Sequence, residues 1–96
     1  MKLNLTNSLI FFDLETTGIN PGTDRIVEIS WLKVYPNGKE ESKTLRINPG
    51  IPIPKEASEI HHITDADVAD CPTFKEVGKL IAREFEGCDI AGFNSN

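Results

Sequence analysis

The stretch that decides the fold runs from Phe11 to Gly18 and reads FFDLETTG. It places two carboxylates, Asp13 and Glu15, at the end of an apolar run, residues 8–14 (SLIFFDL). Aromatic and β-branched residues closed by Thr-Thr-Gly predict a largely buried strand here. Ionised side chains rarely follow a buried strand unless something compensates their charge. The two acids therefore mark a candidate site.

Residues i and i+2 of a strand point to the same face, so Asp13 and Glu15 are expected to lie side by side at the strand's C-terminal end. Protonation of one acid, pairing with basic neighbours, or coordination of a cation would each reconcile the two charges. The nearest following basic residue is Arg25, beyond a loop. Hard oxygen ligands at this spacing suit Mg²⁺ or Mn²⁺. The pattern D-x-E is common, and two solvated carboxylates remain the alternative.

The composition narrows the class of protein. The chain has 96 residues, 39% hydrophobic and 26% charged, with a net charge of −5. This predicts one small folding unit, and no segment approaches the roughly 20 apolar residues that span a bilayer. The acidic balance argues against nucleic-acid binding through a broadly basic face, although bound cations would reverse the local potential. Cys71 and Cys88 lack metal-site spacing, which predicts reduced thiols in a cytoplasmic protein.

The rest of the chain divides into strand, loop and helix segments. In order, the sequence predicts a loop at 19–24, a strand at 25–35, a turn at 36–39 (PNGK), a partner strand at 41–47, an extended connection at 48–54, one or two helical turns at 55–61, an acidic turn at 64–71, a helix from 73 that Gly87 stops, and a strand beginning at 89–93. Asn-Gly at the centre of the turn is a strong hairpin signal. A strand reached through a helical crossover is expected to lie parallel in the same sheet, here beside the first strand.

The clearest helix begins at Thr73, which forms a capping-box pattern with Glu76. One face is expected to pack, and its apolar residues are Phe74, Val77, Leu80, Ile81 and Phe85. Phe74, Phe85 and Trp31 are read as core residues, without the interleaving of aromatic and basic residues that single-strand binding platforms use. Glu28, on the second strand, is either a polar-face residue or a partner of a charged neighbour such as Arg25. One helix would leave one face of the first strand uncovered.

FFDLETTG closely resembles the first motif of the DEDD-type 3′-to-5′ exonucleases, a family that includes the proofreading subunit of the bacterial replicative polymerase and RNA-trimming enzymes. Residues 23–34, 46–77 and 90–96 (IAGFNSN) are similar to later segments of the family. The resemblance implies an α/β fold with a ribonuclease H-like mixed sheet and flanking helices, truncated after the fourth strand begins. Residues 1–96 would then form the N-terminal part of a single exonuclease domain.

The resemblance also implies hydrolysis of the 3′-terminal phosphodiester bond of DNA or RNA with release of nucleoside 5′-monophosphates. Asp13 and Glu15 match the first two acidic ligands of a site for two Mg²⁺ or Mn²⁺ ions and would be catalytic. The positions that match the pocket for the terminal nucleotide are Leu14, Thr16, Thr17, Gly18, His61 and Asn94. His61 is expected to anchor a loop rather than to act as the base, since the family's catalytic His or Tyr belongs to a later motif.

That later motif, and the acidic residue that follows the GFNSN stretch in the family, are not found within residues 1–96, so this chain alone is expected to be an incomplete catalyst. The implied partners are single-stranded or frayed 3′ ends of DNA or RNA, and a DNA polymerase is a candidate; no membrane partner is expected. The alternative is a non-catalytic exonuclease-fold fragment used for binding or for self-association through an unpaired strand edge.

Overall fold

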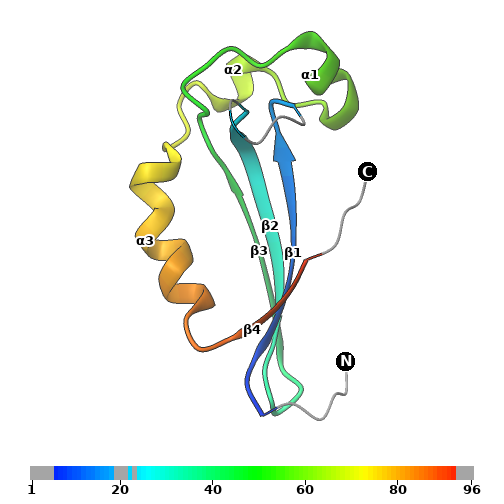
Figure 1. Cartoon of the computed structure of the whole chain (residues 1–96), viewed down its shortest axis with the longest axis vertical. Coiled ribbons are helices and arrows are strands. Elements are labelled where there is room, and N and C mark those ends of the chain that lie inside the picture. The colour runs from blue at the N-terminus through cyan, green and yellow to red at the C-terminus, as the bar shows by residue number, and fades with distance from the viewer. Residues whose placement is uncertain (1–5, 19–21, 23, 93–96) are drawn as a thin grey trace.

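The structure is a computed structural model, and it describes residues 6–18, 22 and 24–92 (Figure 1). The elements in chain order are β1 Leu9–Thr16, β2 Ile26–Val34, β3 Glu40–Arg46, α1 Lys55–His61, α2 Asp65–Val68, α3 Phe74–Phe85 and β4 Asp89–Gly92. The expected loop at 19–24 lies only partly within the described residues, and Asn94 lies outside them.

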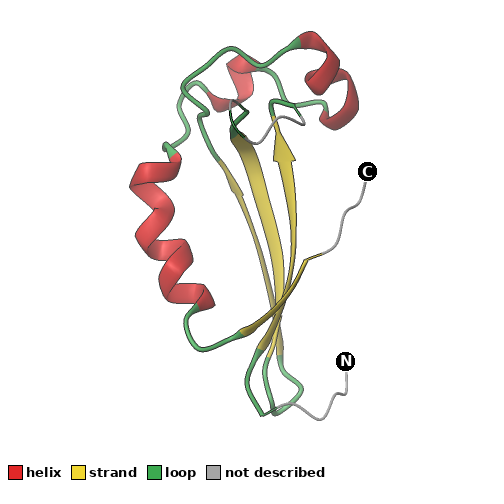
Figure 2. Ribbon diagram, in the orientation of Figure 1, coloured by secondary structure: helices red, strands yellow, loops and turns green. Residues whose placement is uncertain are grey.

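The strands form one sheet in the order β3-β2-β1-β4 (Figure 2). β1 is antiparallel to β2, β2 is antiparallel to β3, and β4 runs parallel to β1 with Leu9 opposite Asp89 and Phe12 opposite Gly92. The helix between β3 and β4 provides the crossover that a parallel pair requires. The predicted mixed sheet, with its hairpin and its parallel fourth strand, is confirmed.

The β2–β3 hairpin turns where the sequence predicts. The backbone amide of Gly38 donates to the Tyr35 carbonyl at 2.9 Å, and the amide of Lys39 donates to the Asn37 side chain at 2.9 Å. Gly38 adopts a φ of 88°, whereas Asn37 keeps a negative φ. Glycine therefore supplies the left-handed residue that closes the hairpin.

Helix α3 covers one face of the sheet (Figure 2). Ile10, Ile29, Trp31 and Ile81 belong to the core cluster between them, and the Phe85 ring meets Trp31 edge-on at 5.4 Å between centroids. Two lysines of the same sheet face contact Glu84 near the end of the helix. Lys33 Nζ donates to the Glu84 carbonyl at 2.9 Å, and Lys43 Nζ lies 3.8 Å from its carboxylate. Apolar burial and these charge contacts dock the helix on the sheet.

The part of the apolar face of α3 that packs on the sheet is narrower than the sequence predicts. Ile81 is 8% exposed and Val77 and Phe85 are partly buried, whereas Phe74 is 46% and Leu80 42% exposed. One residue rotates a helix by about 100°, so Leu80 turns away from the sheet when Ile81 faces it. The expectation that Phe74 and Leu80 belong to the core is wrong.

A second cluster closes the end of the sheet beneath α1 and α2. Its buried members are Val27, Ile53, Ala57, Ile63 and Val68. The predicted acidic turn at 64–71 is wrong in part, because residues 65–68 form α2. The sequence pattern Thr64-x-x-Asp67 marks the start of this helix and was missed in the sequence analysis. The amide of Thr64 donates to the Asp67 carboxylate at 2.9 Å. This hydrogen bond lowers the pKa of Asp67. A capping box thus starts this short helix.

The capping box that the sequence predicts at the start of α3 is present as well. The Thr73 amide donates to the Glu76 carboxylate at 3.1 Å, and the Glu76 amide donates back to the Thr73 hydroxyl at 3.3 Å. The first of these contacts holds the pKa of Glu76 below its ordinary value. Both cysteines are free thiols, as expected. No helix among the described residues is long and apolar enough to cross a membrane.

The narrow stripe on α3 can be tested with two alanine variants. Ile81→Ala removes a buried side chain from the helix–sheet interface and should lower the free energy of unfolding by about 2–4 kcal/mol. Leu80→Ala, one residue away on the same helix, should cost less than about 1 kcal/mol because Leu80 is already 42% exposed. Urea unfolding followed by circular dichroism measures both values. Equal losses would contradict this docking of α3.

Candidate active site

Asp13 and Glu15 lie near the C-terminal end of β1, on the sheet face opposite α3. Ile10, Phe12 and Leu14 alternate with them and pack into the core cluster under the helix. The strand period of two therefore directs both carboxylates to the other face. Both acids are half-buried. Asp13 and Glu15 therefore lie on the same face of β1, as the sequence predicts.

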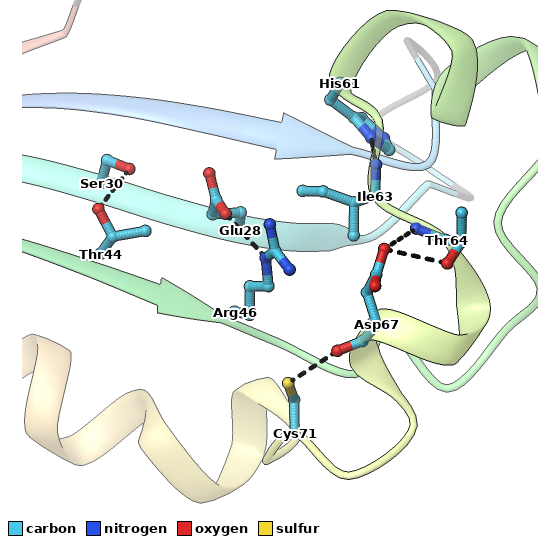
Figure 3. A network of polar contacts seen from close by, with 9 residues as sticks. All are labelled: Glu28, Ser30, Thr44, Arg46, His61, Ile63, Thr64, Asp67 and Cys71. Carbon is cyan, nitrogen blue, oxygen red and sulfur yellow. Dashed lines mark hydrogen bonds and ion pairs between the residues drawn. The ribbon is translucent and has the colours of Figure 1, made fainter.

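Polar side chains of β2 and β3 extend this face as two rows across the sheet. In the first row, Glu15 of β1 pairs with Glu28 of β2, and Glu28 pairs with Arg46 of β3. The Arg46 Nε donates to the Glu28 carboxylate at 3.2 Å. In the neighbouring row, Ser30 and Thr44 join their hydroxyls at 3.1 Å (Figure 3). The partner of Glu28 is thus Arg46 rather than Arg25. Because this ion pair compensates the charge of Glu28, it limits the repulsion that Glu28 exerts on Glu15.

The carboxylates of Asp13 and Glu15 are suitable ligands for a hard divalent cation, but two side chains do not complete a metal site. Two carboxylates on one face are the oxygen ligands that Mg²⁺ and Mn²⁺ take. Within residues 6–18, 22 and 24–92, no group of three or more His, Cys, Asp and Glu side chains could hold a metal ion. Asp13 and Glu15 would supply only two ligands to such a cation, and a complete site would need further ligands from outside the described residues.

An irregularity in the sheet lies directly beside the two acids. Glu15 pairs with Glu28, but the next residue, Thr16, pairs with Ile26, so Val27 is an extra residue on β2. A bulge of this kind increases the local twist and changes the direction of the side chains that follow. Here it lies where the regular strand that carries the carboxylates ends and the chain turns into residues 16–18.

Thr17 fixes the segment after the bulge. Its amide donates to the Arg25 carbonyl at 2.8 Å, its hydroxyl donates to the Asp24 carboxylate at 2.8 Å, and the same oxygen accepts from the Arg25 amide at 2.9 Å. The side chain is only 2% exposed. The Thr17 hydroxyl thus holds residues 24 and 25 against the end of β1. Asp24 is a residue of this site that the sequence reasoning missed, because the contact joins residues across a loop.

Gly18 is required by a close approach. A Cβ atom at this position would lie 2.5 Å from the nearer carboxylate oxygen of Asp24, which is too short for any ordinary contact. The Gly18 amide also donates to the Thr16 hydroxyl at 3.3 Å. The carboxylate of Asp24 can therefore lie against the backbone only because residue 18 has no side chain.

A pocket of about 430 Å³ opens beside these residues. It is lined by Leu14, Glu15, Thr16, Thr17, Gly18, Asp24, Pro54, Glu56, Ala57, Ile60 and His61. Every predicted pocket residue within the described part of the chain is present in this lining, whereas Asp13 is not. The volume falls within the range of small-ligand sites. The pocket combines an apolar wall from α1, where Ile60 is 70% exposed, with a carboxylate at the β1 end.

His61 connects α1 to the end of β1. Its Nδ1 accepts a hydrogen bond from the Ile63 amide at 3.1 Å (Figure 3), so the hydrogen of the neutral ring is on Nε2, which donates to the Thr16 carbonyl at 3.1 Å. Both ring nitrogens are therefore engaged with the backbone. His62 follows in the left-handed conformation with a φ of 60° and ends the helix. His61 holds the pocket wall in place against the strand.

Comparison with known sequences identifies the family. The model of a family described as Exonuclease (RNase_T) matches residues 10–91. A DNA polymerase III subunit epsilon-like protein of Rhodobacter capsulatus is 39% identical over 92% of this chain, and the DNA polymerase III subunit epsilon of Treponema pallidum is 34% identical over 88%. The chain spans 13% of the first relative and 40% of the second.

Comparison with solved structures agrees in fold. Exonuclease I from Methylocaldum szegediense superposes with a TM-score of 0.79 at 26% identity, over 91% of this chain and 20% of that enzyme. E. coli Exonuclease I, in complex with a dT13 oligonucleotide, superposes with a TM-score of 0.78 at 19% identity, over 92% of this chain and 20% of its own. The expected ribonuclease H-like arrangement of a mixed sheet with helices is confirmed. With a family match from residue 10 to residue 91, the chain belongs to the exonuclease family.

Proposed function

We propose that this chain contributes the first two acidic residues of a metal-dependent 3′-to-5′ exonuclease that releases nucleoside 5′-monophosphates from DNA or RNA. The observation that carries the proposal is the pair of carboxylates, Asp13 and Glu15, on one sheet face beside a pocket of about 430 Å³. Membership of the exonuclease family supports it. The relatives named as polymerase III epsilon subunits make a DNA polymerase a candidate partner. A cytoplasmic location is part of the proposal.

The chemistry divides between the strand and the pocket. Asp13 and Glu15 would hold divalent cations, which supply an activated water and neutralise charge on the scissile phosphate when bound. The apolar surfaces of Leu14, Ala57 and Ile60 offer the terminal base a place to pack. The backbone at Thr16, held by His61, offers polar contacts at the strand end. A terminal nucleotide bound in this pocket has its phosphodiester bond near Glu15, because Glu15 lies both on the carboxylate face of β1 and in the pocket wall.

A single-stranded 3′ end is the substrate that such a pocket favours, because a base held in a duplex is not free to enter it. E. coli Exonuclease I, which shares this fold, has been solved with a dT13 oligonucleotide. This supports a single-stranded or frayed end as the substrate. The proposal extends to both DNA and RNA.

One structural observation favours the alternative of self-association. Within the described residues β4 is an edge strand, and its Ile90 is 55% exposed. An exposed apolar edge can pair with a second copy. The catalytic proposal explains the paired carboxylates and their adjoining pocket, which an association surface does not require.

Isosteric substitution of the two acids tests the catalytic proposal. Asp13→Asn and Glu15→Gln, made in the full-length protein, should each reduce hydrolysis with Mn²⁺ by at least about 100-fold, because each removes a charged metal ligand. A 5′-labelled single-stranded oligonucleotide should give a ladder that shortens from the 3′ end. The matched control is Glu59→Gln, an exposed acid of α1 paired with Lys55 at 3.9 Å, which should leave the rate unchanged.

Full activity of both acid variants, or degradation from the 5′ end, would exclude this assignment. If the unmutated protein gives no cleavage with any divalent cation, the exonuclease proposal is wrong and association becomes the favoured role. The labelled 5′ end is decisive here because a 5′-to-3′ enzyme would release the label at once.

A second experiment tests the pocket rim. Gly18→Ala forces a Cβ into the Asp24 carboxylate and should lower the free energy of unfolding by about 1–3 kcal/mol, with a rise in KM for the oligonucleotide. The control is Gly78→Ala in α3, where the nearest atom to an added Cβ is 3.9 Å away. That change should be neutral or stabilise the helix by up to about 1 kcal/mol. Unchanged KM and stability in Gly18→Ala would contradict the close packing of Asp24.

A further inference from the structure

A second groove adjoins the candidate active site. It has a volume of about 370 Å³, and Asp24 lies in the walls of both cavities. Its walls come from the start of β2, the connection at residues 48–50 and the first turn of α3. The residues that give it chemical character are Arg25, Phe74 and Lys75, and we call it the Phe74 groove. Nothing in the proposed hydrolysis step uses it.

The two cations of the Phe74 groove are among the five Lys and Arg residues of the described part of the chain that form no ion pair there. Lys33, Lys43, Arg46 and Lys55 each form an ion pair with a glutamate. Arg25 and Lys75 are exposed, and neither has an ion-pair partner within the described residues. Arg25 and Lys75 together outnumber the one acid in the groove wall, Asp24. They attract a negatively charged ligand to this place.

Phe74 adds an aromatic surface between these charges. The side chain is 46% exposed, although the sequence pattern assigned it to the core. An exposed aromatic ring beside cations is the combination on which single-stranded nucleic acids bind, with bases stacked on the ring and phosphates near the charges. The sequence shows no such interleaving because Arg25 is far from Phe74 along the chain. The fold brings them to one groove.

Two more cations continue from the groove along α3. Lys79 and Arg83 follow Lys75 at intervals of four residues, and both are exposed and border a shallow depression further along the helix. Four residues of helix advance by about 6 Å, so the three charges form a row on one side of α3. Glu84, the acid next to Arg83, turns toward Lys33 and Lys43 on the sheet. Glu86 borders the same depression as Lys79 and Arg83, so the row is positive only in part.

We propose that the Phe74 groove, extended by Lys79 and Arg83, binds the single-stranded part of the substrate that lies upstream of its 3′-terminal nucleotide. One base stacks on Phe74, and successive phosphates lie near Arg25, Lys75 and the cations of α3. The occupant is a nucleic acid because the groove offers both a stacking surface and separated positive charges, and because it adjoins the pocket for the 3′ end. This inference rests on the proposed exonuclease function.

Binding is measured first, in the absence of hydrolysis. The probe is a fluorescent single-stranded oligothymidylate of about ten nucleotides, titrated with the full-length protein in EDTA at several salt concentrations. Phe74→Leu, which keeps an apolar side chain but removes the ring, should weaken binding about tenfold. Lys75→Gln should weaken it and reduce the slope of log K against log salt by about one. The control is Lys39→Gln, an exposed lysine in the β2–β3 turn, at the opposite end of the sheet (Figure 1).

Steady-state kinetics then separate this inference from the proposed function. If the groove binds upstream nucleotides, Phe74→Leu and Arg25→Gln should raise KM for the long oligonucleotide about tenfold and leave unchanged the hydrolysis of the p-nitrophenyl ester of thymidine 5′-monophosphate, which has no upstream nucleotide. Equal losses on both substrates, or wild-type affinity in all groove variants, would overturn the groove proposal while the exonuclease remains. Failure of the unmutated protein to cleave either substrate would overturn the exonuclease function itself. Thermal melting of each variant checks that the fold is intact.

Discussion

The alternation of side chains along β1 is the constraint on which the rest of the structure depends. Ile10, Phe12 and Leu14 enter the core under α3, so Asp13 and Glu15 must face the other side of the sheet. A slip of one residue in the pairing with β2 would exchange the two sets and bury both carboxylates under the helix. The free energy gained by burying the apolar set therefore also fixes the position of the acids. Core packing and site geometry are set by the same register.

The pocket depends on a departure from that regularity. The extra residue Val27 shifts the pairing at Thr16, the last residue of β1, and beyond it the Thr17 hydroxyl attaches the chain to residues 24 and 25. His61 attaches the same segment to α1 from the other side. Hydrogen bonds to two other parts of the chain thus hold this segment in place. The regular strand sets the direction of the carboxylates, and the irregular segment sets the shape of the adjoining cavity.

The sequence predicts those features that depend on local pattern. The hairpin at Gly38, the capping box at Thr73 and the parallel fourth strand follow from turn chemistry, helix-start signals and the handedness of crossovers. The family motif locates Asp13 and Glu15. Features that join distant segments were missed: Asp24 acquires its role from its contact with Thr17, and the Arg46 partner of Glu28 comes from strand pairing. Contacts between distant segments cannot be predicted from residues that are neighbours in the sequence.

The helix α3 shows the same limit in energetic terms. Its sequence has enough apolar residues for a broad buried face, yet the sheet offers a contact only to the stripe of Val77, Ile81 and Phe85. A side chain is buried by the surface that meets it rather than by its own hydrophobicity. Phe74 is left at the rim of a groove, where Arg25 and Lys75 also lie. The net charge of the chain argued against a basic binding face, but binding depends on local charge, and in this fold two cations without an ion pair lie beside an exposed ring.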